Sequence, residues 1–81
     1  MIVPTVISEK GYDVRIFTRD GGKPHVHVAF DGKLIKIFLS PLRHDKSHDR
    51  GKPSKSEVAA AKEIVRKHRA ACIAKWKQIY G

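Results

Sequence analysis

Two histidines stand one residue apart in the segment PHVHVAF, which runs from Pro24 to Phe30. Histidine gains and loses its proton near neutral pH, so a pair of imidazoles can supply both the acid and the base of a hydrolytic reaction. Cleavage of RNA by attack of a 2′-hydroxyl also needs a cation that stabilises the phosphorane-like transition state. Lys36 and Arg15 are the cations that we expect beside His25 and His27. One hypothesis is therefore a metal-independent ribonuclease.

The same residues allow two other interpretations. An H-x-H pair on a strand aims both rings to one side, and His44 and His48 in the segment LRHDKSHDRGK could complete a metal site with His25 and His27. In the simplest interpretation the rings cover the outer face of a sheet and form local hydrogen bonds. A bare H-x-H pattern is a weak motif, and the sequence leaves the three interpretations open. We predict a site that needs no metal and no other cofactor.

The dipeptide Asp31-Gly32 determines which way the histidines face, because it is the strongest short signal for a two-residue hairpin turn. Such a turn pairs His27 with Lys36 and His25 with Phe38. Cross-strand partners share a face, and side chains alternate along each strand. One face is then apolar and forms the core, whereas the histidines lie with Lys36 and Phe38 on the other face, away from the main core. The apolar set is Val26, Val28, Ile35 and Ile37.

The segments around this hairpin predict the rest of the sheet. Residues 3–7 are short and apolar, and residues 12–17 alternate, so further strands are expected there. All strands then lie within residues 3–39. Residues 40–53 are polar, basic and rich in turn formers, which predicts a surface loop.

A helix is predicted after this loop. Ser54 and Glu57 form an S-x-x-E capping box, and the helix should run over residues 54–79 with His68 and Trp76 on its apolar stripe. We expect one α+β domain over residues 1–81. It should contain a small antiparallel sheet of three to four strands, with one long C-terminal helix packed on one face.

The charge of the chain indicates a polyanionic partner. Its 81 residues include 17 Lys and Arg against 8 Asp and Glu, giving a net charge of +9, and most of the excess follows residue 41. Nucleic acid, in the first place RNA, and an acidic partner protein are the partners that fit such a surface. The residues expected to bind them are Arg43, Lys46, Arg50, Lys52, Lys62, Arg66, Arg69 and Lys77.

The composition also predicts a location. No apolar run approaches the roughly 20 residues that span a membrane, and the N-terminus lacks the pattern of a signal peptide. The single cysteine, Cys72, has no internal disulfide partner, which suits a reducing compartment. We therefore expect a cytoplasmic protein without a membrane partner.

Several of these residues resemble a known family. They are Pro4-Thr5, Ile16-Phe17, Asp20, the P-H-x-H-V core at residues 24–28, His68-Arg69 and Trp76. Together they are similar to the domain of unknown function 4160 family, over nearly the whole chain. The resemblance implies a small bacterial protein encoded beside another small protein, in a toxin–antitoxin-like arrangement. Many members carry a further histidine where this chain has Gly21, and this departure weakens a metal site built on three histidines.

These observations combine into one expectation and its alternatives. We expect a nucleic-acid-binding component of a toxin–antitoxin-like module, which is a metal-independent ribonuclease in its sharper form. The alternatives are a non-catalytic module that binds an acidic partner protein, and a small metal-binding protein. Whether the chain is an enzyme is left open by the sequence.

Overall fold

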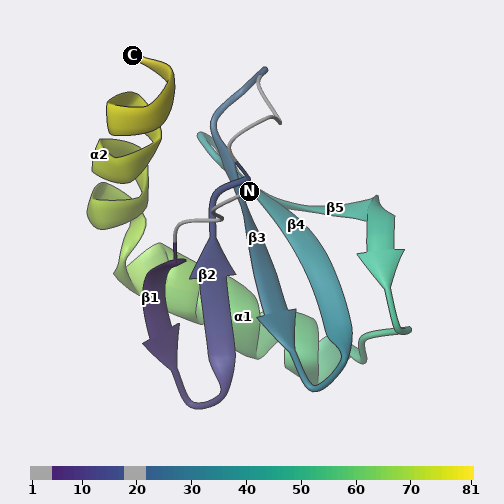
Figure 1. Ribbon diagram of the computed structural model, residues 1–81. Helices are drawn as coiled ribbons and strands as arrows, with labels where there is room; N and C mark the ends of the chain where they lie inside the picture. Colours follow the sequence, from purple (N-terminus) through teal and green to yellow (C-terminus); the bar gives the residue numbers. More distant parts are fainter. Residues whose placement is uncertain (1–4, 18–21) are drawn as a thin grey trace.

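The predicted hairpin lies at the centre of a five-stranded antiparallel sheet, whose strands follow the chain order β1-β2-β3-β4-β5 (Figure 1). The computed structural model describes residues 5–17 and 22–81, so Pro4, Asp20 and Gly21 lie outside the described residues. The strands are β1 (Thr5–Glu9), β2 (Tyr12–Arg15), β3 (His25–Phe30), β4 (Lys33–Leu39) and β5 (Leu42–Arg50). Two helices follow, α1 (Lys55–Lys67) and α2 (Arg69–Tyr80). The α+β class is confirmed.

The register of the β3–β4 hairpin is as predicted. His27 pairs with Lys36 and His25 with Phe38. The turn residues Asp31 and Gly32 have φ values of 44° and 71°, the positive angles that a type I′ turn requires at both central positions. We call the side of the sheet that holds His25, His27, Lys36 and Phe38 the histidine face, and the opposite side the helix face.

The helix face carries the core. Val14, Val26, Val28, Ile35 and Ile37 have no exposed surface, and α1 lies across this side of the sheet (Figure 1). The helices complete the core with buried side chains, which are Ala61, Ile64, Val65, Cys72 and Trp76. Burial raises the pKa of the Cys72 thiol to about 11, so this cysteine is a packing residue rather than a nucleophile.

The surface loop predicted at residues 40–53 is wrong, because β5 occupies most of it. β5 pairs with β4 from Leu39 opposite Leu42 to Lys36 opposite Asp45, and the register then shifts before Leu34 meets Arg50. A bulged strand at the edge of a sheet exposes much of both sides to water. Its polar sequence therefore shows no apolar alternation, and the predicted strand count was too low.

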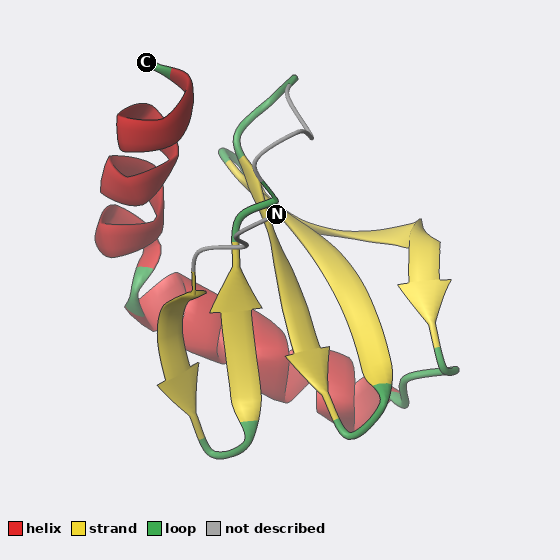
Figure 2. Ribbon diagram, in the orientation of Figure 1, coloured by secondary structure: helices red, strands yellow, loops and turns green. Residues whose placement is uncertain are grey.

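The single long helix is also wrong, since the chain leaves helical geometry at His68 (φ −111°, ψ 23°). Three contacts hold this break against the sheet. His68 Nε2 lies 3.1 Å from a Glu9 carboxylate oxygen, Lys67 Nζ lies 2.8 Å from the other, and Arg69 Nε donates to the Leu39 carbonyl at 2.6 Å. Figure 2 shows the result: α2 leaves the direction of α1 and rises beside the end of the sheet.

The predicted capping box is present and joins α1 to the hairpin. The Ser54 hydroxyl accepts from the Glu57 amide at 3.2 Å, and the Glu57 carboxylate accepts from the Ser54 amide at 2.9 Å. The same carboxylate lies 2.8 Å from Lys33 Nζ at the start of β4. The Lys33 ammonium, and then the Ser54 amide, hold the pKa of Glu57 below its ordinary value of 4.5.

This ion pair predicts an acid-sensitive contribution to stability. Because the folded pKa of Glu57 is lowered, its contribution is present above about pH 4.5 and is lost as the pH falls through the folded pKa. Glu57→Gln should therefore flatten the fall in melting temperature on acidification below pH 4.5. Glu63→Gln is the control, because Glu63 pairs with Arg66 through side chains 58% and 62% exposed, and such pairs contribute little. If both substitutions changed the acid dependence of the melting temperature equally, the ion pair of Glu57 with Lys33 would not be its cause.

Candidate nucleic-acid interface

The histidine face brings the predicted site residues together. Arg15 on β2 pairs with His27 on β3, and His27 pairs with Lys36 on β4. These three positions form one row across the sheet, and His25 lies two residues along β3 from His27. The row continues to Asp45 on β5, which pairs with Lys36.

The two histidine rings are nevertheless buried, with 2% of His25 and 6% of His27 exposed. The expectation that they lie away from the core on an outer surface is wrong in this respect. The His27 ring stacks on Phe17 with ring centres 4.0 Å apart. His25 lies edge-on to His27 at 5.3 Å and contacts the Trp76 ring at 5.0 Å.

The two histidine rings are buried because the helix breaks at His68. The break places α2 at the end of the sheet, where β3 begins, so that Trp76 covers His25. The Tyr80 hydroxyl donates to the Phe17 carbonyl and fixes the segment that covers His27. The His25 ring is also oriented by its Nδ1, which lies 2.7 Å from the Lys23 carbonyl oxygen.

Two cations flank an aromatic ring on the same face. Lys36 Nζ lies 5.1 Å from the centre of the Phe38 ring, and Arg43 Cζ lies 4.6 Å from it. Phe38 and Arg43 are paired across β4 and β5, so both point to the histidine face. Arg43 was predicted as a basic loop residue, and its contact with Phe38 was not predicted, because β5 was not recognised as a strand.

Arg15 completes this surface at its other side. Its guanidinium lies 2.9 Å from the Asp13 carboxylate, and the two side chains are 38% and 35% exposed. The Ser8 hydroxyl and then Arg15 hold the pKa of Asp13 below its ordinary value. Arg15 is therefore a positioned cation on the histidine face, between β1 and β3, with Asp13 as its partner.

The other predicted basic residues are spread over several elements. Arg66 pairs with the Glu63 carboxylate on the same helix, so its charge is balanced locally. Arg69 is held by the Leu39 carbonyl at the helix break. The remaining members lie on different elements: Lys46 and Arg50 on β5, Lys52 after it, Lys62 on α1 and Lys77 on α2.

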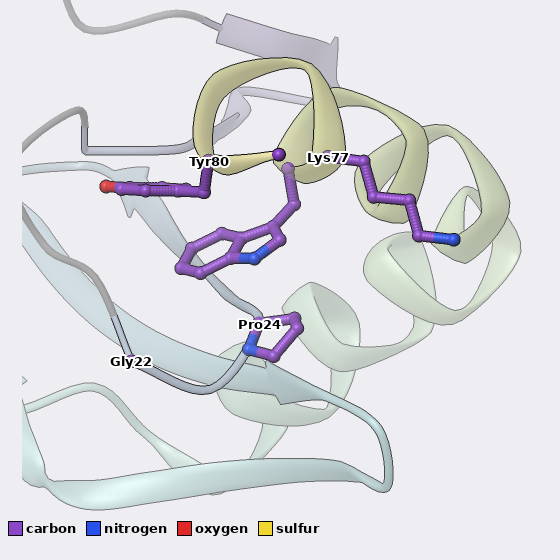
Figure 3. A pocket seen from close by; sticks show the side chains of 6 residues that line it. Gly22, Pro24, Lys77 and Tyr80 are labelled. Carbon is purple, nitrogen blue, oxygen red and sulfur yellow. The ribbon is translucent and has the colours of Figure 1, made fainter.

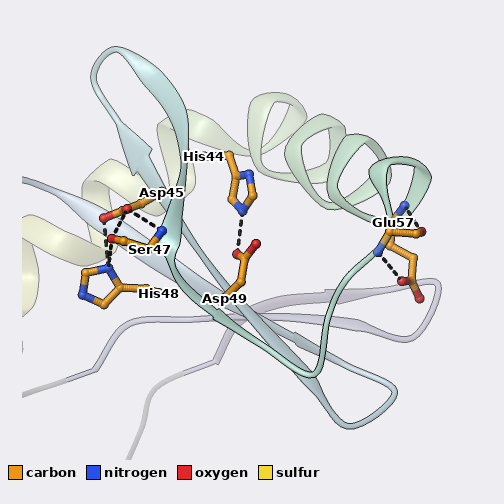
Figure 4. A network of polar contacts seen from close by, with 7 residues as sticks. His44, Asp45, Ser47, His48, Asp49 and Glu57 are labelled. Carbon is orange, nitrogen blue, oxygen red and sulfur yellow. Dashed lines mark hydrogen bonds and ion pairs between the residues drawn. The ribbon is translucent and has the colours of Figure 1, made fainter.

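The four histidines of the alternative metal site are not gathered. His44 pairs with Ile37, which places it on the helix face, and its Nε2 lies 2.7 Å from Asp49 Oδ1. His48 Nδ1 lies 3.0 Å from Asp45 Oδ2. Figure 4 shows these as two separate pairs. Within residues 5–17 and 22–81, no group of three or more His, Cys, Asp and Glu side chains is arranged to hold a metal ion.

A hollow of about 480 Å³ lies where α2 meets the start of β3, and it was not predicted. Figure 3 shows Pro24 below the helix turn that carries Tyr80 and Lys77, whose side chains point in opposite directions. Trp76 also lines it and contacts Tyr80, with ring centres 4.2 Å apart and ring planes tilted by 36°. The hollow is an aromatic surface beside the buried histidines, and Lys77 is its one cation among the described residues.

Comparison with protein families identifies the chain. A family model described as a domain of unknown function (DUF4160) matches residues 11–77. The chain belongs to this family. The match runs from the turn before β2 almost to the end of α2, so it includes the histidine face and Trp76. No curated protein and no solved structure matches the chain significantly.

The DUF4160 description assigns no activity, so the function has to be argued from the chain's own side chains. In the described part of the chain, neither helix is long and apolar enough to cross a membrane.

Proposed function

We propose that this DUF4160 protein binds single-stranded nucleic acid, RNA in the first place, through Arg15, Lys36, Phe38 and Arg43 on the histidine face. The observation that carries the proposal is the Phe38 ring with two cations over it, Lys36 at 5.1 Å and Arg43 at 4.6 Å from its centre. Single strands are bound by surfaces that combine cations for the phosphates with flat groups on which bases stack. The guanidinium of Arg43, held over an aromatic ring, is such a flat cationic group.

The position of these groups on a sheet supports the proposal. Arg15 and Lys36 occupy the same row on β2 and β4, on either side of His27, and neighbouring strands are about 4.8 Å apart. The backbone positions of the two residues are therefore roughly 10 Å apart. An extended strand can bridge such a span with its phosphates while a base contacts Arg43 or Phe38. α1 covers the other face, so it does not compete for this one (Figure 1).

The proposal predicts a steep dependence of binding on salt. Log affinity for a single strand should fall linearly with log salt, by a slope of about −0.7 for each phosphate contacted. Lys36→Gln with Arg43→Gln should weaken binding and flatten the slope by about 0.7 for each contact removed. The measurement is fluorescence anisotropy with labelled RNA and DNA of the same sequence.

The control for this prediction removes two charges elsewhere. Lys10→Gln with Lys75→Gln changes the net charge equally, in the β1–β2 turn and on α2, and should leave the slope within error. Arg69→Ala is not a suitable variant, because it also breaks the hydrogen bond to the Leu39 carbonyl. Binding that does not depend on salt would reject nucleic acid as the ligand.

Cleavage of the bound RNA is a separate hypothesis, favoured by one observation: Arg15, His27 and Lys36 share a row, with His25 5.3 Å from His27. The burial of both rings opposes it, since an acid or base must come within hydrogen-bond reach of the reacting atoms. We therefore propose binding without cleavage, with His25 and His27 as packing residues. Two results would support the ribonuclease instead. The purified protein would have to cleave RNA in EDTA, and His27→Ala would have to abolish this cleavage at a temperature where the variant is folded.

The alternative of an acidic protein partner has a direct test. If the chain is one half of a two-protein, toxin–antitoxin-like module, its expression without the product of the neighbouring gene should alter growth. Growth arrest that persists in Lys36→Gln with Arg43→Gln would show that the proposed nucleic-acid surface is not its cause. An acidic partner protein whose binding weakens with salt, together with no detectable binding of RNA, would favour the non-catalytic module.

A further inference from the structure

A second hollow, of about 420 Å³, lies between β5 and the N-terminal half of α1, and we call it the β5–α1 groove. Its lining includes three lysines, Lys46, Lys55 and Lys62, and an apolar part formed by Pro53, Val58 and Ala59. This groove lies at the helix face, because His44, which also lines it, pairs with Ile37. It is therefore separate from the histidine face proposed to bind nucleic acid.

The charge of the groove is unbalanced. In the part of the chain that the structure describes, none of Lys46, Lys55 and Lys62 takes part in an ion pair. The one acidic residue of the lining, Asp49, is bound to His44 at 2.7 Å. The His44 side chain is 11% exposed, so this pair is a fixed part of the wall. The lining therefore presents three lysines against one carboxylate that already has a partner.

We infer that the β5–α1 groove binds an organic phosphate, meaning a phosphate monoester carried on a flat apolar group, as in a mononucleotide. A phosphate monoester has a charge of about −1.5 to −2 at neutral pH, so it gains more from three lysines than a single carboxylate does. Lysine is a common phosphate ligand that acts as a point charge. The N-terminus of α1 is already occupied by its capping box of Ser54 and Glu57, so the attraction for the anion comes from the three lysines.

The apolar part of the lining determines the rest of the ligand. Pro53, Val58 and Ala59 offer carbon atoms and no side-chain hydrogen-bond donors, which suits the face of a base or another flat ring. The volume also lies within the roughly 300–1,000 Å³ of small-molecule sites. Phosphate alone would leave this surface uncovered, and the nucleoside alone would leave the lysines without an anion.

The test uses AMP, adenosine and inorganic phosphate as probes, titrated into the full chain by calorimetry at low salt. AMP should bind at least about tenfold more tightly than adenosine or inorganic phosphate, because only AMP uses both parts of the groove. Lys46→Gln with Lys62→Gln should weaken AMP binding about tenfold or more, the effect of losing one charged hydrogen bond. Lys10→Gln with Lys75→Gln, which removes the same charge outside the groove, should leave it within about twofold.

Amide chemical shifts give a second measurement that does not depend on the variants. AMP should shift the Val58, Ala59 and Lys62 signals of α1 and leave those of Lys36 and Phe38 on the histidine face unchanged. AMP that binds no more tightly than inorganic phosphate would overturn the inference. The inference would also be overturned if the groove variant (Lys46→Gln with Lys62→Gln) and the control (Lys10→Gln with Lys75→Gln) lost AMP affinity to the same extent.

The phosphate monoester could come from a free nucleotide or from the end of a strand. An oligonucleotide with and without a 5′-phosphate separates these sources when the protein carries Lys36→Gln and Arg43→Gln. Tighter binding of the phosphorylated strand indicates a strand end, and AMP binding with no such gain indicates a free nucleotide. AMP affinity should be unchanged in this background, so failure of the histidine face as an interface would not affect the inference on the groove.

Discussion

Val28→Asp is expected to leave the domain unfolded in the absence of denaturant. Val28 has no exposed surface and lies between Val14 on β2 and Ile35 on β4. An unpaired carboxylate at this place costs several kcal/mol, whereas a domain of this size has a total stability of about 5–15 kcal/mol. Circular dichroism should show loss of the sheet and helix signal, and amide resonances should collapse to the unfolded range.

The control for Val28→Asp introduces the same carboxylate at an exposed place. Ala70 is exposed in the first turn of α2, which has no acidic residue. Ala70→Asp should fold as the unchanged chain does, because an acidic group is favourable at a helix N-terminus. A Val28→Asp protein that melts at the temperature of the Ala70→Asp control would contradict the assignment of Val28 to the core.

His27→Ala is expected to reduce stability by about 3 kcal/mol, within the range of large-to-small substitutions at buried rings. The His27 ring is 6% exposed and stacks on Phe17 at 4.0 Å, so its loss leaves a cavity that Phe17 and His25 have to fill. For a domain of this size the melting temperature should fall by roughly 12–24 °C. Thermal unfolding followed by circular dichroism makes the measurement.

His48→Ala is the matched comparison for His27→Ala. The His48 side chain is 54% exposed and lies 3.0 Å from the Asp45 carboxylate on β5. Its replacement should cost less than about 1 kcal/mol, as is usual for surface positions. If His27→Ala melts like the unchanged chain while RNA cleavage or growth arrest disappears, the imidazole has a chemical role and the packing assignment is wrong.

The hairpin was predictable because its signals are local. Asp31-Gly32 determines the turn, and the two-residue period of the strands then determines which side chains share a face. β5 could not be predicted in the same way, because a bulged edge strand with polar residues on both sides has no apolar alternation. The division into two helices could not be predicted either, because the apolar stripe continues through His68. The break between the helices depends on contacts with Glu9 and Leu39, which are distant in the sequence.

The candidate site was predictable to the same extent. The row of Arg15, His27 and Lys36 follows from register and alternation alone. The burial of His27 does not, because it depends on Phe17, which is anchored by Tyr80 from the far end of the chain. Arg43 was assigned to a basic surface without its partner Phe38, since the contact requires β5 to pair with β4. Long-range packing thus decides which predicted residues remain accessible.

The most direct test of the proposed nucleic-acid interface is a titration of the labelled protein with an unphosphorylated single-stranded RNA, followed through backbone amide shifts. We expect the largest shifts at Arg15, Lys36, Phe38 and Arg43, on three strands of the histidine face. Signals of Ala71 and Gln78, exposed on α2, should remain unchanged. Shifts confined to the helices, or no shifts at RNA concentrations that saturate other single-strand-binding domains, would contradict it.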